Sequence, residues 1–270
     1  MSGLPSFPRR FDIIRKECQS KEYQENSAYF QFSENFFWAC DHLSAKAAAR
    51  FATKGKPNLH EYIAISYSLW LTNQINGILL LLNVSLISQA WQLIRSIWEA
   101  KIYLMYIAKK PGERCKAFIC EFDEDFKKLK NEKEKGNPFV VFDFQSLPLP
   151  KRAEMYSKDV WVEKLSEKAT DIGLENEYSS IYKAFSWSTH PNNSTFADYV
   201  SFNANGIEFN ANQKTEYIPF ALIGAGGETF KVICEINKVL KIFTDKEIEA
   251  FNSELEKLIA QHNEQSASNI

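Results

Sequence analysis

The sequence predicts an all-α fold, a helical bundle of about seven or eight helices with one small β-hairpin excursion. Three observations predict it. Apolar side chains recur at three- and four-residue spacing through most of the chain, as they do on the buried face of a helix. Only 10 Gly and 9 Pro interrupt 270 residues, too few for an all-β fold with many tight turns. The 21 Phe, 11 Tyr and 6 Trp supply large rings for helix contacts.

The centre of the fold is expected to be two long apolar helices, over residues 58–82 and 85–109. They follow a first helix over residues 27–53, which a Lys-Gly-Lys-Pro run ends. Ser85 is expected to cap the third helix, and a Pro-Gly pair ends it. Because their connection is short, the two long helices should form an antiparallel hairpin.

The second half of the chain is expected to hold shorter and more peripheral elements. A highly charged helix over 113–135 has only a narrow apolar stripe, which is typical of a solvated helix. Three prolines in residues 136–152 indicate a surface loop. Two shorter helices are expected next, over about 159–172 and 175–189.

Local signals place the last elements. The Asn205-Gly206 pair is a hairpin turn signal between two short aromatic runs. The glycines in residues 223–227 lack the third glycine of a dinucleotide fingerprint, so they indicate close helix packing. Thr244 and Glu247 form a capping-box pattern that opens a final helix. With no repeat and no long linker, one domain is expected over residues 1–270, with its core at about 28–260 and a frayed C-terminal tail.

The composition excludes several classes of function. A net charge of −2 gives no general attraction to nucleic acid, and DNA binding is not expected. Five cysteines without a framework indicate reduced thiols. The N-terminus lacks a signal-peptide pattern, and the most apolar run, residues 77–87, is too short to span a bilayer. We therefore expect a cytoplasmic protein with no membrane span. No pattern predicts a cofactor or a metal.

The first candidate site is a polar stripe on the helix over 85–109. Its members share three- and four-residue spacing on an otherwise apolar helix: Ser88, Gln92, Arg95, Ser96 and Glu99. Arg95 and Glu99 are spaced to form an i,i+4 ion pair. The stripe faces either a polar interior or the solvent, and the sequence leaves both open.

The second candidate site lies at the end of the helix predicted over 175–189. Ser186 and His190 are four residues apart and so share one helical face, just before a proline. A His at a helix C-terminus is stabilised in its charged form, which suits a proton donor or a phosphate contact. The alternative is a His that only caps the helix end.

Together these residues resemble a known family. Two motifs resemble those of a bacterial all-α family described as domain of unknown function 5677. They are Arg95-x-x-x-Glu99 in an aliphatic helix and, much later, Tyr182-Lys-x-Phe-Ser186-x-x-x-His190. The resemblance covers roughly residues 60–200. In that family an Arg follows the Tyr, and its spacing to the His is similar to the motif of the HEPN ribonucleases, helical proteins common in toxins and phage defence.

The resemblance implies a metal-independent endoribonuclease or a toxin-type effector in phage defence, with RNA as its partner. His190 would be the general acid and base, and Ser186 and Glu99 would orient the site. Lys183 stands where the family has Arg, and a Lys cannot offer a bidentate fork to phosphate. Arg95 or Lys183 would hold the scissile phosphate.

The alternative is a non-enzymatic helical module that binds a partner or serves as a scaffold. Arg95, Glu99, Ser186 and His190 would then form a buried polar network that fixes the helix register. The partner would be another protein or a second copy in a homodimer. The grouping of motif residues favours the enzyme, whereas the absence of a basic surface favours the module, so the sequence leaves open whether the protein is an enzyme.

Overall fold

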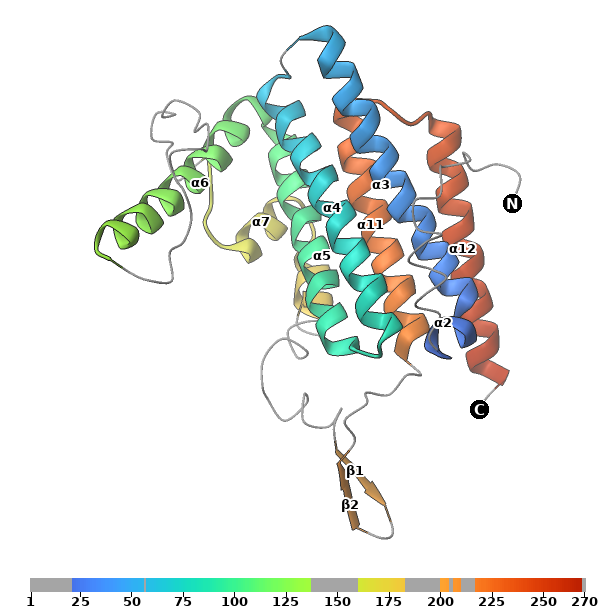
Figure 1. Ribbon diagram of the computed structural model, residues 1–270. Coiled ribbons are helices and arrows are strands. Elements are labelled where there is room, and N and C mark those ends of the chain that lie inside the picture. Colours follow the sequence, from blue (N-terminus) through green and yellow to red (C-terminus); the bar gives the residue numbers. More distant parts are fainter. Residues whose placement is uncertain are drawn as a thin grey trace.

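The computed structural model describes residues 21–55, 57–136, 160–182, 200–203, 206–209 and 217–268. Its architecture confirms the all-α class. Five long helices run side by side in a bundle (Figure 1). They are α3 (Ser27–Lys54), α4 (Leu59–Asn83), α5 (Ile87–Lys109), α11 (Ile218–Leu240) and α12 (Asp245–Ser268).

The helix pair α4 and α5 forms the expected hairpin, and its start follows from local sequence. The Asn58 side chain accepts a hydrogen bond from the Glu61 N–H at 3.0 Å, and the Glu61 carboxylate accepts one from the Asn58 N–H at 3.0 Å. This reciprocal capping box satisfies two N–H groups that the first turn leaves unpaired. The hairpin therefore begins within a residue of its predicted position.

The prediction that Ser85 caps α5 is wrong. Ser85 has a φ of 59°, in the left-handed region, and it lies in the turn between the two helices. Its hydroxyl donates a hydrogen bond to Glu22 at 3.0 Å, and Leu86, which has no capping side chain, occupies the N-cap of α5. The Ser85 hydroxyl therefore binds a carboxylate that is distant in the sequence, and it does not cap the start of α5.

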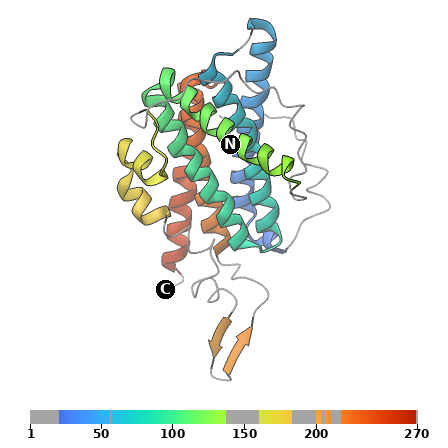
Figure 2. The same cartoon turned by 90° about the vertical axis from the view of Figure 1, so that its left-hand side faces the viewer.

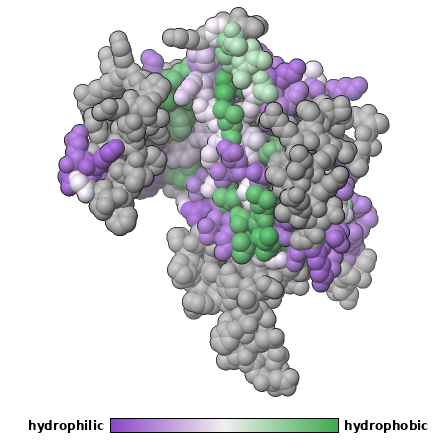
Figure 3. Space-filling view, viewed as in Figure 1, coloured by the Kyte–Doolittle hydropathy of each residue, from purple (hydrophilic) through white to green (hydrophobic). Residues whose placement is uncertain are grey.

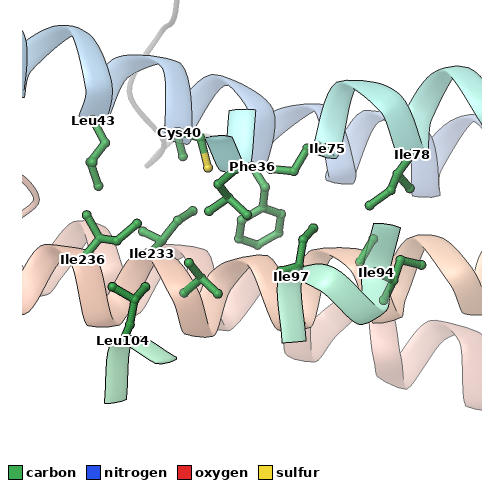
Figure 4. Close-up of a cluster of buried hydrophobic side chains, with 14 of the residues drawn as sticks. Phe36, Cys40, Leu43, Ile75, Ile78, Ile94, Ile97, Leu104, Ile233 and Ile236 are labelled. Carbon is green, nitrogen blue, oxygen red and sulfur yellow. The ribbon is translucent and has the colours of Figure 1, made fainter. Parts of the chain in front are cut away.

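The helix α11 is the central element that sequence reasoning did not identify as a long helix. It packs against α3, α4, α5 and α12. A Cβ atom added at Gly226 would lie 2.6 Å from Cε1 of Phe32 on α3, closer than any ordinary contact. The expected role of the glycines in close helix packing is thus confirmed. Figure 4 shows Ile233 and Ile236 of α11 facing apolar side chains of the neighbouring helices.

The peripheral helices leave the bundle on the side of α5. The helix α6 (Pro111–Glu134) projects away from it, as its charged sequence predicts (Figure 1). Next come α7 (Leu165–Asp171), α8 (Glu175–Glu177) and the π-helix η1 (Tyr178–Tyr182). Figure 2 shows this yellow segment on one side of the bundle, and α7 contacts α5.

The helix count differs from the prediction. The described ranges contain ten helical segments rather than seven or eight. The difference arises from α11, which was not expected as a helix, from the short α2 (Lys21–Glu25), and from α8, which passes directly into η1 instead of continuing as one helix. Residues 137–152 of the predicted loop and 183–189 of the predicted helix lie outside the described residues.

Two further features complete the fold. The strands β1 (Val200–Asn203) and β2 (Gly206–Phe209) pair antiparallel, with Val200 opposite Phe209. The α12 capping box is confirmed, since the Glu247 N–H donates to Thr244 Oγ1 at 3.3 Å and the Thr244 N–H donates to the Glu247 carboxylate at 2.8 Å. Within the described ranges, no helix has the length and apolar character needed to cross a bilayer.

Candidate functional site

Arg95, Glu99 and Tyr182 form a partly exposed group that we call the Arg95 cluster. Arg95 Nε donates a hydrogen bond to Glu99 Oε1 at 2.9 Å, so the predicted i,i+4 pair is formed. The same guanidinium donates to the Tyr182 hydroxyl, and its Cζ lies 4.3 Å from the centroid of the Tyr182 ring. The Arg95 and Glu99 side chains are 18% and 31% exposed. The pair is therefore neither enclosed in the core nor fully solvated.

The position of Tyr182 is set by aromatic packing around η1. The rings of Tyr178 and Tyr182 stack with centroids 4.6 Å apart, and Tyr182 lies 5.8 Å from the ring of Trp98. Trp98 is fully buried on α5, one turn from Arg95. Single π-helical turns are often found at functional sites. Here the turn brings Tyr178 and Tyr182 onto the same face of α5.

The structure joins part of the sequence-predicted site and leaves the rest untested. It brings the Arg95 helix to Tyr182, the residue that directly precedes Lys183. Lys183, Ser186 and His190 lie outside the described residues.

The remaining members of the polar stripe do not line one common surface. Ser88 is buried and Gln92 is exposed. The Ser96 hydroxyl donates to the carbonyl of Gln92 at 3.1 Å within α5. Helical spacing predicted which side chains share a face, but the neighbouring helices decide how deeply each is buried.

A second group of charges, which sequence reasoning missed, lies deeper in the bundle. Lys101 Nζ contacts Glu177 Oε1 and lies 2.9 Å from Glu228 Oε2. Lys231 Nζ lies 2.8 Å from Glu228 Oε1 and 3.7 Å from Glu177 Oε1. Only 3% of the Lys101 side chain and 9% of the Glu228 side chain are exposed. This Lys101 cluster ties α5, α8 and α11 together.

Electrostatics keep the Lys101 cluster charged. Burial alone would raise the pKa of Glu177, but hydrogen bonds from Lys101 and Trp98 and the charges of Lys101 and Lys231 lower it overall. Burial would lower the pKa of Lys231, and the charge and hydrogen bond of Glu228 raise it instead. Opposite charges at hydrogen-bond distance favour the charged forms of both partners. Glu177 and Lys231 are therefore both charged at neutral pH.

The only sequence signal for this cluster was weak. Lys101 is a single cation in an apolar stretch of α5, where every third or fourth neighbour is buried. A lone cation on an apolar helix face indicates that a partner is required. The partner carboxylates could not be identified from the sequence, because Glu177 is 76 residues away and Glu228 is farther still.

The other end of the segment over residues 160–182 is also fixed by charges and aromatic rings. Arg114 donates a hydrogen bond to Asp171 at 2.9 Å, and this bond lowers the pKa of the Asp171 carboxyl. The Lys168 ammonium is fully buried, 4.5 Å from the ring of Trp161 and 4.9 Å from that of Tyr103. The segment is thus held to α5 and α6 before it reaches the Arg95 cluster.

Two cavities in the described part of the chain lie away from the Arg95 cluster. A cavity of about 440 Å³ is lined by residues that include His60, Glu61 and Lys238. A smaller one of about 230 Å³ adjoins the Lys101 cluster and is lined by Met105, Cys234 and others. Across the described ranges, no group of His, Cys, Asp and Glu is arranged to hold a metal ion.

Comparisons with known proteins give one match. The model of a family of unknown function (DUF5677) matches residues 61–207, which is more than half of the chain. The matched range contains Arg95, Glu99 and Tyr182 as well as His190. No curated protein and no solved structure gives a match. The chain belongs to the DUF5677 family of unknown function.

Proposed function

We propose that the Arg95 cluster and the segment that follows it form a metal-independent RNA-cleaving site. One observation carries this proposal: Arg95 and Tyr182, 87 residues apart in the sequence, meet in a partly exposed position. By contrast, Lys101 and Glu228 of the Lys101 cluster are only 3% and 9% exposed. The Arg95 cluster is accessible and leads directly into the chain that carries Lys183, Ser186 and His190.

The proposed reaction uses the RNA as its own nucleophile. The ribose 2′-oxygen attacks the adjacent phosphorus, the bond from phosphorus to the 5′-oxygen breaks, and a 2′,3′-cyclic phosphate and a 5′-hydroxyl are formed. His190 would move the proton between the 2′-hydroxyl and the leaving oxygen as general base and acid. Arg95 would stabilise the charge that develops on the phosphate, aided by Lys183. Glu99 and Tyr182 would hold the Arg95 fork in position, and Ser186 would orient the site.

The test is cleavage of single-stranded RNA in excess chelator. We expect His190→Ala to abolish cleavage, and Arg95→Ala to lower kcat by about 100-fold or more, as removal of one transition-state donor does. Arg95→Lys should restore only part of the loss, because Lys lacks the planar fork. Lys257→Ala removes one cation from the exposed face of α12 and serves as the matched control. A wild-type protein that leaves RNA intact would contradict the proposal.

A second candidate function is the non-enzymatic helical module, which the Lys101 cluster favours. Its four charges pair with one another and link three helices, as expected of a device that fixes helix register. If His190 belongs to a similar internal network, His190→Ala would leave a buried group without a partner. The variant would then lose about 1–3 kcal/mol of stability. Measuring cleavage and thermal stability on the same variant separates the two functions.

A further inference from the structure

The outward face of α4 is unusual for a helix at the surface of a bundle. Its exposed positions lie at three-, four- and seven-residue spacing and so form one stripe along the helix: Tyr62, Ser66, Leu69, Asn73 and Leu80. The Tyr62, Leu69 and Leu80 residues are 52%, 55% and 45% exposed. Val84 and Leu86, in the turn that follows, are 59% and 42% exposed. We call these seven residues the α4 stripe.

The α4 stripe carries no charge. The sequence has no Asp, Glu, Lys, Arg or His from Tyr62 to Ile94. By contrast, the exposed face of α12 carries Asp245, Lys246 and Glu249. Solvated helix faces are normally charged, and charged residues are depleted at the centres of protein interfaces. The α4 stripe therefore has the composition of a contact surface.

The order of side chains along the α4 stripe is self-complementary. Three pairs of residues are centred on residues 74–75 in the sequence: Leu69 with Leu80, Ser66 with Val84, and Tyr62 with Leu86. Asn73 lies next to this centre. Figure 3 shows green apolar patches over α4 on either side of a purple band.

We propose that the α4 stripe is the contact surface of a homodimer, with α4 packed antiparallel against α4 of a second copy. A two-fold axis near residues 74–75 places Leu69 of each copy against Leu80 of the other, and brings the two Asn73 amides together at the centre. An isologous contact needs one patch that complements itself, which this order of residues provides. The inference does not rest on the proposed RNA cleavage.

The size of the stripe sets the expected strength of the dimer. A 25-residue helix is about 37 Å long. A contact between one face of this helix and the same face of a second copy buries an area at the lower end of the range for protein interfaces. Reversible association that depends on protein concentration is therefore expected, rather than an obligate dimer. Sedimentation velocity over a concentration series should show the mass rising from 31.2 kDa toward twice that value.

Exchanged charges test the antiparallel geometry. Leu69→Glu alone and Leu80→Lys alone each place an unpaired charge in the contact, and each should weaken dimerisation by about tenfold or more. The double variant places Glu and Lys opposite each other twice across the two-fold axis, so it should recover dimerisation. In a parallel arrangement each residue would face its own counterpart, and the double variant would not recover.

The controls separate loss of contact from loss of folding. Both leucines are about half exposed, so the single variants should keep the wild-type circular dichroism and melting temperature. Ile259→Glu places a charge at an exposed apolar residue of α12 and should leave dimerisation unchanged. A wild-type protein that stays monomeric at every concentration, or a double variant no better than the singles, would overturn the proposal.

Discussion

Lys101 lies between the carboxylates of Glu177 and Glu228, with almost none of its side chain exposed. Removing one partner of a buried ion pair costs more than the pair contributes, because the remaining charge is left desolvated and uncompensated. A single side chain of α5 therefore pairs with carboxylates from two other helices, of which Glu228 is only 9% exposed. Arg95 is a different case, since its pair with Glu99 is local and partly exposed.

We predict that Lys101→Met lowers the free energy of unfolding by about 3–5 kcal/mol. The remaining carboxylates would then share only Lys231, which is half exposed. Lys110→Met is the control, because Lys110 is an exposed cation just beyond the same helix, and its loss should change stability by no more than about 0.5 kcal/mol. Urea titrations of both variants measure the difference. Equal stability of the two would show that the buried pairs do not form in solution.

At the scale of elements, the best predictions concerned helix ends and exposed faces. The ends of α3, α4 and α6 lie within a few residues of the predicted positions, and the α12 capping box forms as expected. These features depend on residues within one turn of each other. Ser85 and the central position of α11 could not be predicted, since the first depends on Glu22 and the second on contacts with four other helices.

The close contact between α11 and α3 leads to a prediction at Gly226. Alanine favours a helix over glycine by about 1 kcal/mol, but its Cβ would overlap the ring of Phe32. That ring is itself held edge-on against Phe36 at a centroid distance of 4.9 Å, so it has little room to move. Overpacking costs about 1–3 kcal/mol, and we expect Gly226→Ala to lower the melting temperature.

The matched control for Gly226 is Gly112. A Cβ added at Gly112 in α6 would meet no atom within 4 Å, so Gly112→Ala should leave the melting temperature unchanged or slightly higher. A Gly226→Ala variant that melts at or above the wild-type temperature would mean that α11 and α3 are not in such close contact.

At the scale of the whole molecule, the segment over residues 160–182 is attached to the bundle by ion pairs in addition to apolar contacts around Trp98 and Trp161. Asp171 pairs with Arg114 and Lys109, and Glu177 pairs with Lys101 and Lys231. The pKa values of both carboxyls are lowered in the folded protein. Such a group stabilises the folded state above its unfolded pKa, and this contribution is lost as the pH falls through the folded pKa.

The expected consequence is that acid releases this segment before the bundle unfolds. Below about pH 4, where unfolded Asp and Glu titrate, amide hydrogen exchange over residues 160–182 should speed up while α4 and α11 stay protected. The double variant Asp171→Asn, Glu177→Gln should show fast exchange there already at pH 7. Glu249→Gln, on the exposed face of α12, is the control. Uniform acid unfolding of segment and bundle together would disprove the idea.

The sequence by itself determined the helices α3, α4, α6 and the start of α12, the charged character of α6 and the pairing of Arg95 with Glu99. Each of these depends on side chains three or four residues apart, whose positions follow from helix geometry alone. Only the tertiary structure decided that Lys101 meets Glu177 and Glu228, that Tyr182 lies against Arg95, and that α11 occupies the centre. The reason is physical: which distant groups meet is set by how whole helix faces pack, and many pairings of apolar faces satisfy the same local periodicity.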